Sequence, residues 1–247
     1  MQEICIIIPC YNEEKRLPVQ ELIAFYNENT QYCFCLVNDG SSDKTLDILN
    51  DIRKSREERI SVNNLAKNSG KAEAIRQSMN FCLNWKEFSY IGYLDADLST
   101  PLNELNYLTS FINGNYDIIT GSRIKRMGAV IERNPKRHYL GRIFSTISSM
   151  ILRLPFYDTQ CGAKIIKKEI VPILFDKPFM SKWLFDVEMF SRLRNRFGES
   201  YALTKIYEAP LNEWIEKGKS KIGLSYFFKV PFELLRIHRK YNRKRKH

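Results

Sequence analysis

The chain has 247 residues, of which 44% are hydrophobic and 13% are aromatic. It is therefore long enough to bury a substantial core, and its composition excludes a wholly disordered protein. The formal net charge is +11, which favours an anionic partner such as a nucleic acid, an acidic membrane or a phosphorylated substrate. Much of this charge lies in residues 236–247, which contain no acid.

Strands and helices are predicted to alternate through the first half of the chain. Apolar runs predict strands at residues 4–8, 32–38, 60–65, 90–94 and 117–120, and helical spacing predicts helices at 22–26, 45–52, 72–83 and 105–112. The alternation predicts right-handed βαβ units, and therefore an α/β fold with a mostly parallel central sheet and helices on both faces. Ligands of such a sheet gather at the carboxyl ends of its strands.

The pattern changes after Gly121. A basic loop over residues 121–138 precedes an amphipathic helix whose apolar residues share one face: Leu140, Ile143, Phe144, Ile147, Met150 and Ile151. We then expect a helix at 185–196, a strand near 202–209 and a last helix at 224–241. The expected organisation is one α/β domain over residues 1–222, followed by an amphipathic helix and polybasic tail over residues 223–247.

The cysteines and the apolar runs indicate the cellular setting. The six cysteines lack the spacing of metal-binding motifs, and most lie in apolar stretches where a thiol behaves as a small hydrophobe. No apolar run approaches the roughly 18 to 20 residues that span a bilayer, and the first residues do not resemble a cleavable leader. We therefore expect a reduced, cytoplasmic protein whose membrane contact is peripheral, on the inner face.

Two acidic residues, Asp95 and Asp97, follow the apolar run YIGYL. An i, i+2 pair at the end of a strand can point both carboxylates to the same side. Mg²⁺ and Mn²⁺ prefer such hard oxygen ligands, and they often keep only one or two protein carboxylates when substrate phosphates complete the shell. A lone Asp-x-Asp is typical of an ordinary acidic loop. Its place at the end of the fourth strand favours a site for a divalent cation instead.

Polar residues also follow the other predicted strands. Asp39 begins the loop DGSSDKT, where it can serve as a turn residue or accept a ring N–H from a nucleobase. Tyr11 and Glu13 follow the first strand in PCYNEE, and Pro9 stiffens the exit from that strand. The segment KNSGKAEAIR resembles a phosphate loop, but the Walker spacing and the GxGxxG fingerprint are absent. These absences argue against ATP hydrolysis and nicotinamide chemistry.

Taken in order, these segments resemble the nucleotide-sugar transferases of the GT-A fold. The matching motifs are IIIPCYNEE, VNDGSSDKT, NSGKAEAIR, DADLSTP, GSR, DTQCGAK, FDVEM and LNEWIEKGKSK, over roughly residues 4–221. The resemblance is to the inverting glycosyltransferase family 2, in particular to its dolichyl- and polyprenyl-phosphate glucosyltransferases. It implies transfer of a hexose, expected to be glucose from UDP-glucose, to a polyprenyl phosphate. The alternative is a family 2 enzyme that acts on a saccharide hydroxyl in polysaccharide or glycan synthesis.

The resemblance also implies roles for particular residues. Four would hold the base and ribose of the donor: Pro9, Tyr11, Glu13 and Asp39. Lys71 would lie near the nucleotide, Ala96 would contact the nucleotide sugar, and Asp95 with Asp97 would bind the diphosphate through Mg²⁺ or Mn²⁺. Three would line the sugar and acceptor side: Gln160, Asp186 and Glu188. Three are candidates for binding phosphates: Arg123, Arg133 and Lys221. Arg123 is the first of these, because a planar guanidinium suits bidentate phosphate binding; for Arg133 a solvated basic loop is an equal alternative.

The implied reaction is one displacement, in which an acceptor oxygen attacks the anomeric carbon opposite the leaving nucleoside diphosphate. A hydroxyl acceptor needs a general base, for which Asp186 is the first candidate and Glu188 the second. A phosphate monoester needs none, because its second pKa near 6 leaves it largely ionised at neutral pH. The pH response of an Asp186 variant therefore distinguishes the two acceptors.

The last predicted helix carries apolar residues at helical spacing, and the basic run follows it directly. Such a helix can lie on an anionic membrane, with residues 224–247 as the contact. The alternative is a helix packed on the core with a solvated tail. A nucleic-acid-binding protein would leave the strand-end carboxylates unexplained, so we expect no nucleic acid partner. Nothing in the sequence indicates an oligomeric state.

Overall fold

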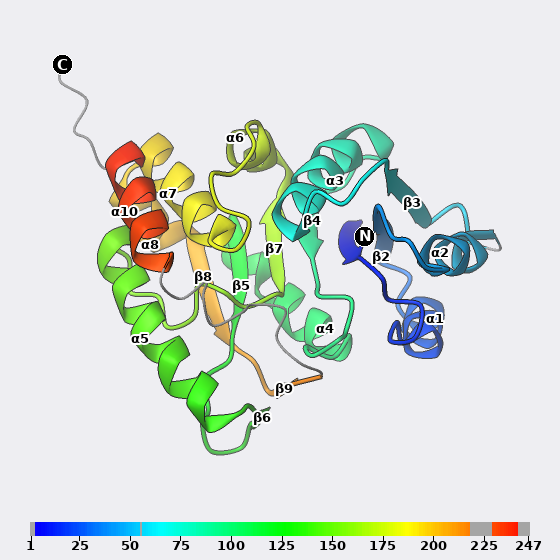
Figure 1. Ribbon diagram of the computed structural model, residues 1–247, viewed down its shortest axis with the longest axis horizontal. Helices are drawn as coiled ribbons and strands as arrows, with labels where there is room; N and C mark the ends of the chain where they lie inside the picture. Colours follow the sequence, from blue (N-terminus) through cyan, green and yellow to red (C-terminus); the bar gives the residue numbers. More distant parts are fainter. Residues whose placement is uncertain (1–2, 55, 218–228, 242–247) are drawn as a thin grey trace.

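The computed structural model describes residues 3–54, 56–217 and 229–241, with the side chains of residues 136–138 outside the description (Figure 1). A seven-stranded sheet has the order β3-β2-β1-β4-β7-β5-β8, and β6 pairs with β9 in a second sheet. Only β7 runs antiparallel to its neighbours in the large sheet. The strands are β1 Ile4–Cys10, β2 Tyr32–Asp39, β3 Ile60–Leu65, β4 Tyr90–Tyr93, β5 Ile118–Ser122, β6 Val130–Glu132, β7 Lys164–Lys167, β8 Ile206–Pro210 and β9 Glu213–Ile215.

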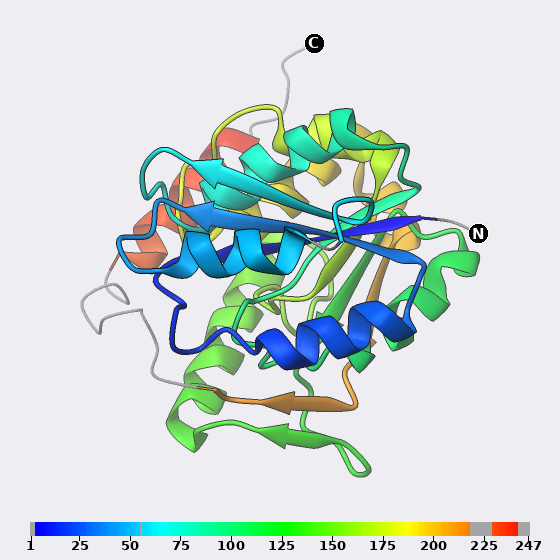
Figure 2. The same cartoon turned by 90° about the vertical axis from the view of Figure 1, so that its right-hand side faces the viewer.

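Helices cover both faces of the large sheet (Figure 2). The α-helices are α1 Val19–Glu28, α2 Thr45–Lys54, α3 Lys71–Trp85, α4 Asn103–Thr109, α5 Pro135–Leu152, α6 Val171–Phe175, α7 Phe185–Phe197, α8 Glu199–Lys205 and α10 Val230–Tyr241. Two 3-10 turns are η1 Ser110–Gly114 and η2 Lys168–Ile170. The expected α/β class, with a mostly parallel sheet and helices on both faces, is confirmed.

Strand β1 shows why the sheet is covered on both sides. Successive side chains of a strand point to opposite faces, and a strand buried on both faces reads as a continuous apolar run. Ile6 and Ile8 belong to the core cluster that includes residues of α1, α2 and α4. Cys5 and Ile7 belong to the opposite cluster, with residues of α3, α6 and α7. All six cysteines are buried free thiols.

The structure differs from the prediction near residues 199–210 and at residues 164–167. The predicted strand at 202–209 begins only at Ile206, because residues 199–205 form α8. Gly198, at φ +93°, separates α7 from α8, and the following residues Ala202 and Leu203 favour helix. The strand β7 was not predicted, because its four residues KIIK are too short and too charged to stand out.

The described part of the C-terminal segment is α10. Its residues Leu234 and Ile237 are buried in the same core cluster as α7, so this helix packs on the sheet domain. Residues 224–228 of the predicted last helix lie outside the described residues. None of the helices that the structure describes combines the length and the apolar composition needed to cross a bilayer.

Candidate active site

The polar residues that follow β1, β2 and β4 meet in one cavity of about 660 Å³. Its other side is lined by two loops, with Asp158 and Gln160 in one and residues 182–184 in the other, and by the start of α7, by α5 and by β9. It collects twelve of the fourteen residues proposed from the sequence: Pro9, Tyr11, Glu13, Asp39, Lys71, Asp95, Ala96, Asp97, Arg123, Arg133, Gln160 and Asp186. Glu188 does not line the cavity, and Lys221 lies outside the described residues.

Asp95 and Asp97 follow β4 in a tight turn. Leu98 takes a left-handed conformation with φ +48°, which is unusual for a leucine, and its N–H donates to the carbonyl of Asp95. Asp97 Oδ1 accepts a hydrogen bond of 2.9 Å from the N–H of Ser99. Residues held in such strained conformations cluster at functional sites. The turn thus fixes both carboxylates at the cavity.

The position of Asp95 also depends on Gly162, which comes from the loop before β7. A Cβ on residue 162 would lie 2.0 Å from Asp95 Oδ2, so only glycine leaves room for this carboxylate. Gly162 lies in the motif DTQCGAK, which by itself does not indicate this role. The close approach of two segments far apart in the chain is the feature that the sequence pattern could not reveal.

The surroundings of Asp95 and Asp97 suit a cation. Lys71 Nζ forms an ion pair with Asp95 Oδ1. Burial alone would lower the pKa of Lys71, but the charges of Asp95, Asp186 and Asp97 outweigh burial and raise it. The described part of the chain holds no cluster of three or more His, Cys, Asp or Glu ligands. The pair fits an ion that keeps one or two protein carboxylates and completes its shell with water and substrate phosphates.

Asp39 joins the end of β2 to the loop before α3. Its Oδ1 accepts hydrogen bonds from the N–H (2.8 Å) and hydroxyl (3.0 Å) of Ser69, and its Oδ2 accepts one of 2.9 Å from the N–H of Gly70. Gly40, at φ +62°, allows this contact, because a Cβ there would lie 2.4 Å from the backbone of Asn68. Asp39 therefore shapes the rim of the cavity as well as lining it.

Asp186, at the start of α7, is held by two buried groups. Its Oδ1 accepts a hydrogen bond from the hydroxyl of Tyr93 and forms an ion pair of 2.8 Å with Lys164 Nζ. Burial and the charge of Asp186 raise the pKa of Tyr93 well above its usual value, so the phenol stays a donor. Lys164 is fully buried and also donates to the carbonyls of Thr159 (3.2 Å) and Cys161 (2.6 Å). Lys164 was not predicted from the sequence.

Glu188, the second candidate base, lies two residues after Asp186 in α7, on the opposite side of the helix, and is completely buried. Its Oε2 accepts a 2.7 Å hydrogen bond from the N–H of Met180. Its Oε1 accepts bonds from Arg192 (3.0 Å) and from the hydroxyl of Tyr241 (2.8 Å). Glu188 thus connects α7 with the loop before it and with α10.

Arg123, at the end of β5, forms a bidentate pair with Asp158. Its Nε lies 2.6 Å from Oδ2 and its Nη2 lies 2.9 Å from Oδ1, and the guanidinium also lies over the ring of Trp214. Burial alone would raise the pKa of Asp158, but the charge and hydrogen bonds of Arg123 outweigh burial and hold that pKa well below its usual range. Arg123 thus lines the cavity with its charge already balanced, and Asp158 is a partner that sequence reasoning missed.

Gln160 and Arg133 also line the cavity. The side-chain nitrogen of Gln160 is buried and has no hydrogen-bond partner among the described residues. An unsatisfied buried donor is costly, and it suits a ligand that supplies an acceptor oxygen. Arg133 packs against α5 at Gly141, where a Cβ would lie 2.8 Å from its guanidinium. Lys182 and Lys217, which were not predicted, add cations to the cavity wall.

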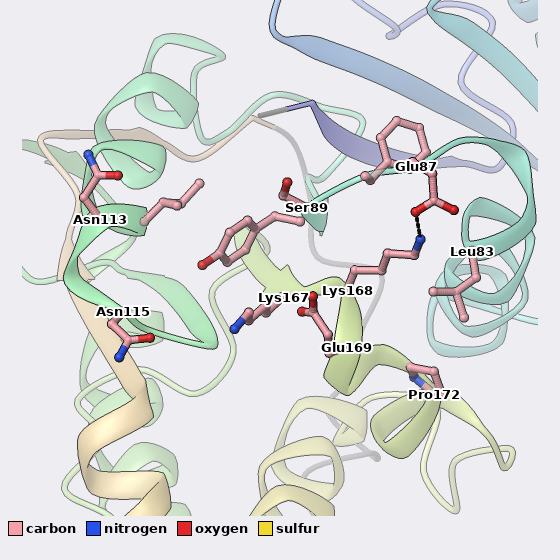
Figure 3. Close-up of a pocket in the computed structure, with 12 residues that line it drawn as sticks. Leu83, Glu87, Ser89, Asn113, Asn115, Lys167, Lys168, Glu169 and Pro172 are labelled. Carbon is pink, nitrogen blue, oxygen red and sulfur yellow. Dashed lines mark hydrogen bonds and ion pairs between the residues drawn. The ribbon is translucent and has the colours of Figure 1, made fainter. Parts of the chain in front are cut away.

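A second hollow, of about 720 Å³, lies at the other end of the strands, near the start of β4 and the end of β7 (Figure 3). Lys168 and Glu87 form an ion pair across it. It contains none of the described residues that were proposed from the sequence, and it faces the amino ends of the parallel strands. The cavity at the carboxyl ends is therefore the candidate active site.

Comparison with known proteins agrees with this geometry. Residues 5–174 match the family model described as Glycosyl transferase family 2. The chain is 30% identical over 245 residues to a dolichyl-phosphate beta-glucosyltransferase of Trichomonas vaginalis, covering 94% of this chain and 69% of the relative. It is 28% identical over 201 residues to a dolichyl-phosphate beta-glucosyltransferase of Dictyostelium discoideum, covering 75% of this chain and 60% of the relative.

Among solved structures, the chain is similar to glucosyl-3-phosphoglycerate synthase from Mycobacterium tuberculosis. The complex of that enzyme with Mn²⁺, UDP and phosphoglyceric acid superimposes with a TM-score of 0.67 at 14% identity, covering 96% of this chain and 78% of the other. This likeness shows the fold and confirms the expected GT-A architecture. Because the family model matches more than half of the chain, the chain belongs to glycosyl transferase family 2.

Proposed function

We propose that this protein transfers glucose from UDP-glucose to a polyprenyl phosphate, with inversion at the anomeric carbon. The observation that carries the choice of acceptor is the pairing of Asp186 with Lys164. A base must take up a proton, and protonating Asp186 would leave the fully buried Lys164 without its counter-charge. Breaking a buried pair in this way costs about 3–5 kcal/mol. An acceptor that is already ionised, such as a phosphate monoester, avoids this cost.

The donor side of the proposal rests on residues of the first four strands. Pro9, Tyr11, Glu13 and Asp39 line the part of the cavity that would take the base and ribose. Lys71 would contact the diphosphate, and Asp95 and Asp97 would hold Mg²⁺ or Mn²⁺. When bound, the metal would supply positive charge that stabilises the leaving nucleoside diphosphate. Mn²⁺ and UDP occur together in the related synthase structure, which supports this assignment.

The acceptor side rests on Gln160, Arg133 and Asp186. The unsatisfied amide of Gln160 would donate to a substrate oxygen, and Arg133 would bind the acceptor phosphate. Asp186 would position the sugar as a fixed acceptor of hydrogen bonds. We assign Glu188 to the framework, because both of its oxygens bind protein groups and it lies outside the cavity. Lys221, outside the described residues, remains a proposed phosphate ligand.

Such an acceptor implies work at a membrane surface. We propose that the protein is cytoplasmic and binds the inner face peripherally, with residues 224–247 contributing positive charge toward anionic lipids. The names of the family 2 relatives, dolichyl-phosphate beta-glucosyltransferases, support a lipid phosphate as acceptor.

The proposal is tested by a panel of radiolabelled nucleotide sugars with undecaprenyl or dolichyl phosphate, in Mn²⁺ or Mg²⁺. The expected result is labelled glucose in the organic phase, from UDP-glucose, in wild type and not in Asp97→Ala. Label found instead on a soluble saccharide would show that the acceptor is a hydroxyl. Transfer that continues unchanged in Asp97→Ala would exclude the proposed metal pair.

The pH profile of Asp186→Asn distinguishes the two acceptors on its own. With a phosphate acceptor, the variant loses rate through poorer positioning of the sugar, and its profile keeps the shallow shape of wild type. If Asp186 is a base, wild type has an acidic limb governed by a carboxylate and the variant lacks that limb. Asp117→Asn is a suitable control, because Asp117 is a buried carboxylate that accepts a hydrogen bond from the hydroxyl of Tyr201 and does not line the cavity.

A further inference from the structure

Helix α5 exposes an apolar strip beside the mouth of the cavity. The strip consists of Tyr139, Leu140, Ile143, Ile147 and Met150, which recur at helical spacing and are 44% to 74% exposed. The buried side of the same helix runs along Ser145, Ser148 and Leu152. The strip is therefore a second apolar face of α5, next to the face that packs on the core. Large contiguous apolar patches on a protein surface mark binding sites for proteins, ligands or membranes.

Helix α10 extends this surface. It lies beside α5 and contacts it, at the left of Figure 1. Leu234 and Ile237 of α10 are buried against the core, whereas Phe232 and Leu235 are exposed. Two neighbouring helices thus keep large apolar side chains in solvent.

The strip is continuous with the cavity. Leu140 belongs to both, and Phe144 of α5 and Val230 of α10 also line the cavity. A hydrocarbon chain attached to a phosphate in the cavity would therefore meet apolar side chains of both helices at the edge. The polar parts of the cavity, around Asp95 and Asp39, lie on the side built by the first four strands.

The charged residues of α5 and α10 indicate which kind of partner fits this apolar surface. The sequence of α5 contains no acidic residue, and that of α10 contains only Glu233, which accepts a hydrogen bond from Ser181. Arg236 and Arg239 are exposed on α10, and Arg153 is exposed just after α5. Two copies of this surface would bring like charges together, which is unfavourable at an interface. An anionic lipid surface instead offers hydrocarbon for the strip and phosphate for the arginines.

Building on the proposed lipid-phosphate acceptor, we propose that the strip of α5, together with Phe232 and Leu235, inserts into an anionic membrane. Amphipathic helices of this kind bury their apolar face at the boundary of headgroups and acyl chains. Insertion brings the mouth of the cavity to the level of the lipid headgroups. The phosphate of a membrane-borne acceptor then reaches Arg133 and Gln160 while its hydrocarbon chain stays in the bilayer.

The test uses the full chain with the triple substitution Ile143→Ser, Ile147→Ser and Met150→Ser. These side chains are exposed and lie outside the cavity lining, so the fold and the site are left intact. The matched control replaces the same three residues by leucine, and a second control, Phe81→Ser, removes an exposed apolar side chain from α3. Binding is measured by flotation with vesicles of phosphatidylcholine, with and without phosphatidylglycerol. Transfer is measured to a long polyprenyl phosphate in vesicles and to a short, water-soluble prenyl phosphate.

The serine variant is expected to lose at least tenfold in binding to anionic vesicles and in transfer to the vesicle-borne acceptor. Its transfer to the soluble acceptor should stay at the wild-type level, and both controls should behave as wild type. Vesicle binding that is unchanged in the serine variant would overturn the inference while leaving the proposed function intact. A serine variant that changes only its oligomeric state would also overturn the inference, because the strip would then contact a second copy of the chain. If wild type transfers to neither prenyl phosphate, the proposed function itself fails.

Discussion

At the scale of single residues, Gly162 limits the position of Asp95. Substituting alanine would place a Cβ 2.0 Å from Asp95 Oδ2, so the carboxylate or the loop before β7 must move. Because misplacing a reacting group by about 1 Å costs on the order of 100-fold in rate, we expect Gly162→Ala to lower transfer by about that factor. Measured kcat and the Mn²⁺ concentration for half-maximal rate should both change. Gly128→Ala controls for backbone strain alone: alanine is strained at the φ of +81° there, but its Cβ would meet no atom within 4 Å. Equal activity of the two variants would contradict this account.

The pair formed by Arg123 and Asp158 makes stability depend on pH. The pKa of Asp158 is held well below its usual range, so the pair stabilises the fold above the unfolded pKa of about 3.9, and this contribution falls as pH drops further. We expect Asp158→Asn to cost about 3–5 kcal/mol at pH 7, because it leaves Arg123 as an unpaired buried charge. Urea unfolding should show that the difference in free energy of unfolding between wild type and Asp158→Asn becomes smaller below pH 4, by up to about 1.4 kcal/mol per pH unit. A difference in free energy of unfolding that stays constant down to pH 3 would contradict the proposed pairing of Asp158 with Arg123.

Several site residues could be proposed from the sequence because they follow predicted strands directly. Asp39, Asp95 and Asp97 are of this kind, since the carboxyl ends of parallel strands always meet at one edge. Lys164 and Asp158 gave no such signal. A lysine is normally exposed, and only the packing of β7 between β4 and β5 shows that this one is buried.

At the scale of elements, β7 couples the two sides of the site. Its first residue, Lys164, is the register partner of Tyr93 in β4, and both side chains bind Asp186 at the start of α7. We expect Lys164→Met to cost about 3–5 kcal/mol of stability and about 100-fold in rate, because it leaves Asp186 buried and unpaired. The double variant with Asp186→Asn should recover most of the stability but none of the rate. Additive losses of stability in the double variant would show that the two side chains are not coupled.

Elements with a simple period were predictable, and those defined by distant partners were not. The five strands expected in the first half all exist. Four of them, β1, β2, β4 and β5, are almost wholly buried and therefore consist largely of apolar residues, whereas β3 is partly exposed. The short strands β6, β7 and β9 depend on pairing with distant segments, which periodicity does not describe. The apolar residues of α5 were predicted to share a face, but periodicity could not tell that Ile143 and Met150 point to solvent.

At the scale of the whole molecule, the first and second halves of the chain line different sides of the cavity. The segments up to Asp97 supply Asp39, Lys71, Asp95 and Asp97, which line the proposed donor side, and the later segments supply Gln160, Arg133 and Asp186. Residues 236–247 carry seven more positive than negative charges, out of a net +11 for the chain, and the described ones among them, Arg236, Arg239 and Lys240, do not line the cavity. The excess charge therefore says little about the donor, whose diphosphate must be balanced locally.

If the charge of the diphosphate is neutralised inside the cavity, UDP should stabilise the protein only together with a divalent metal. A ligand at 100 times its Kd stabilises a fold by about 2.7 kcal/mol, which in a protein of this size raises Tm by roughly 5–10 °C. We expect such a shift with UDP and Mn²⁺, and little shift when EDTA replaces the metal, because Asp95 and Asp97 would then repel the diphosphate. Asp97→Ala should lose the metal-dependent part while keeping its own Tm without ligand. A shift with UDP that EDTA leaves unchanged would mean that Lys71 and the neighbouring arginines hold the diphosphate by themselves.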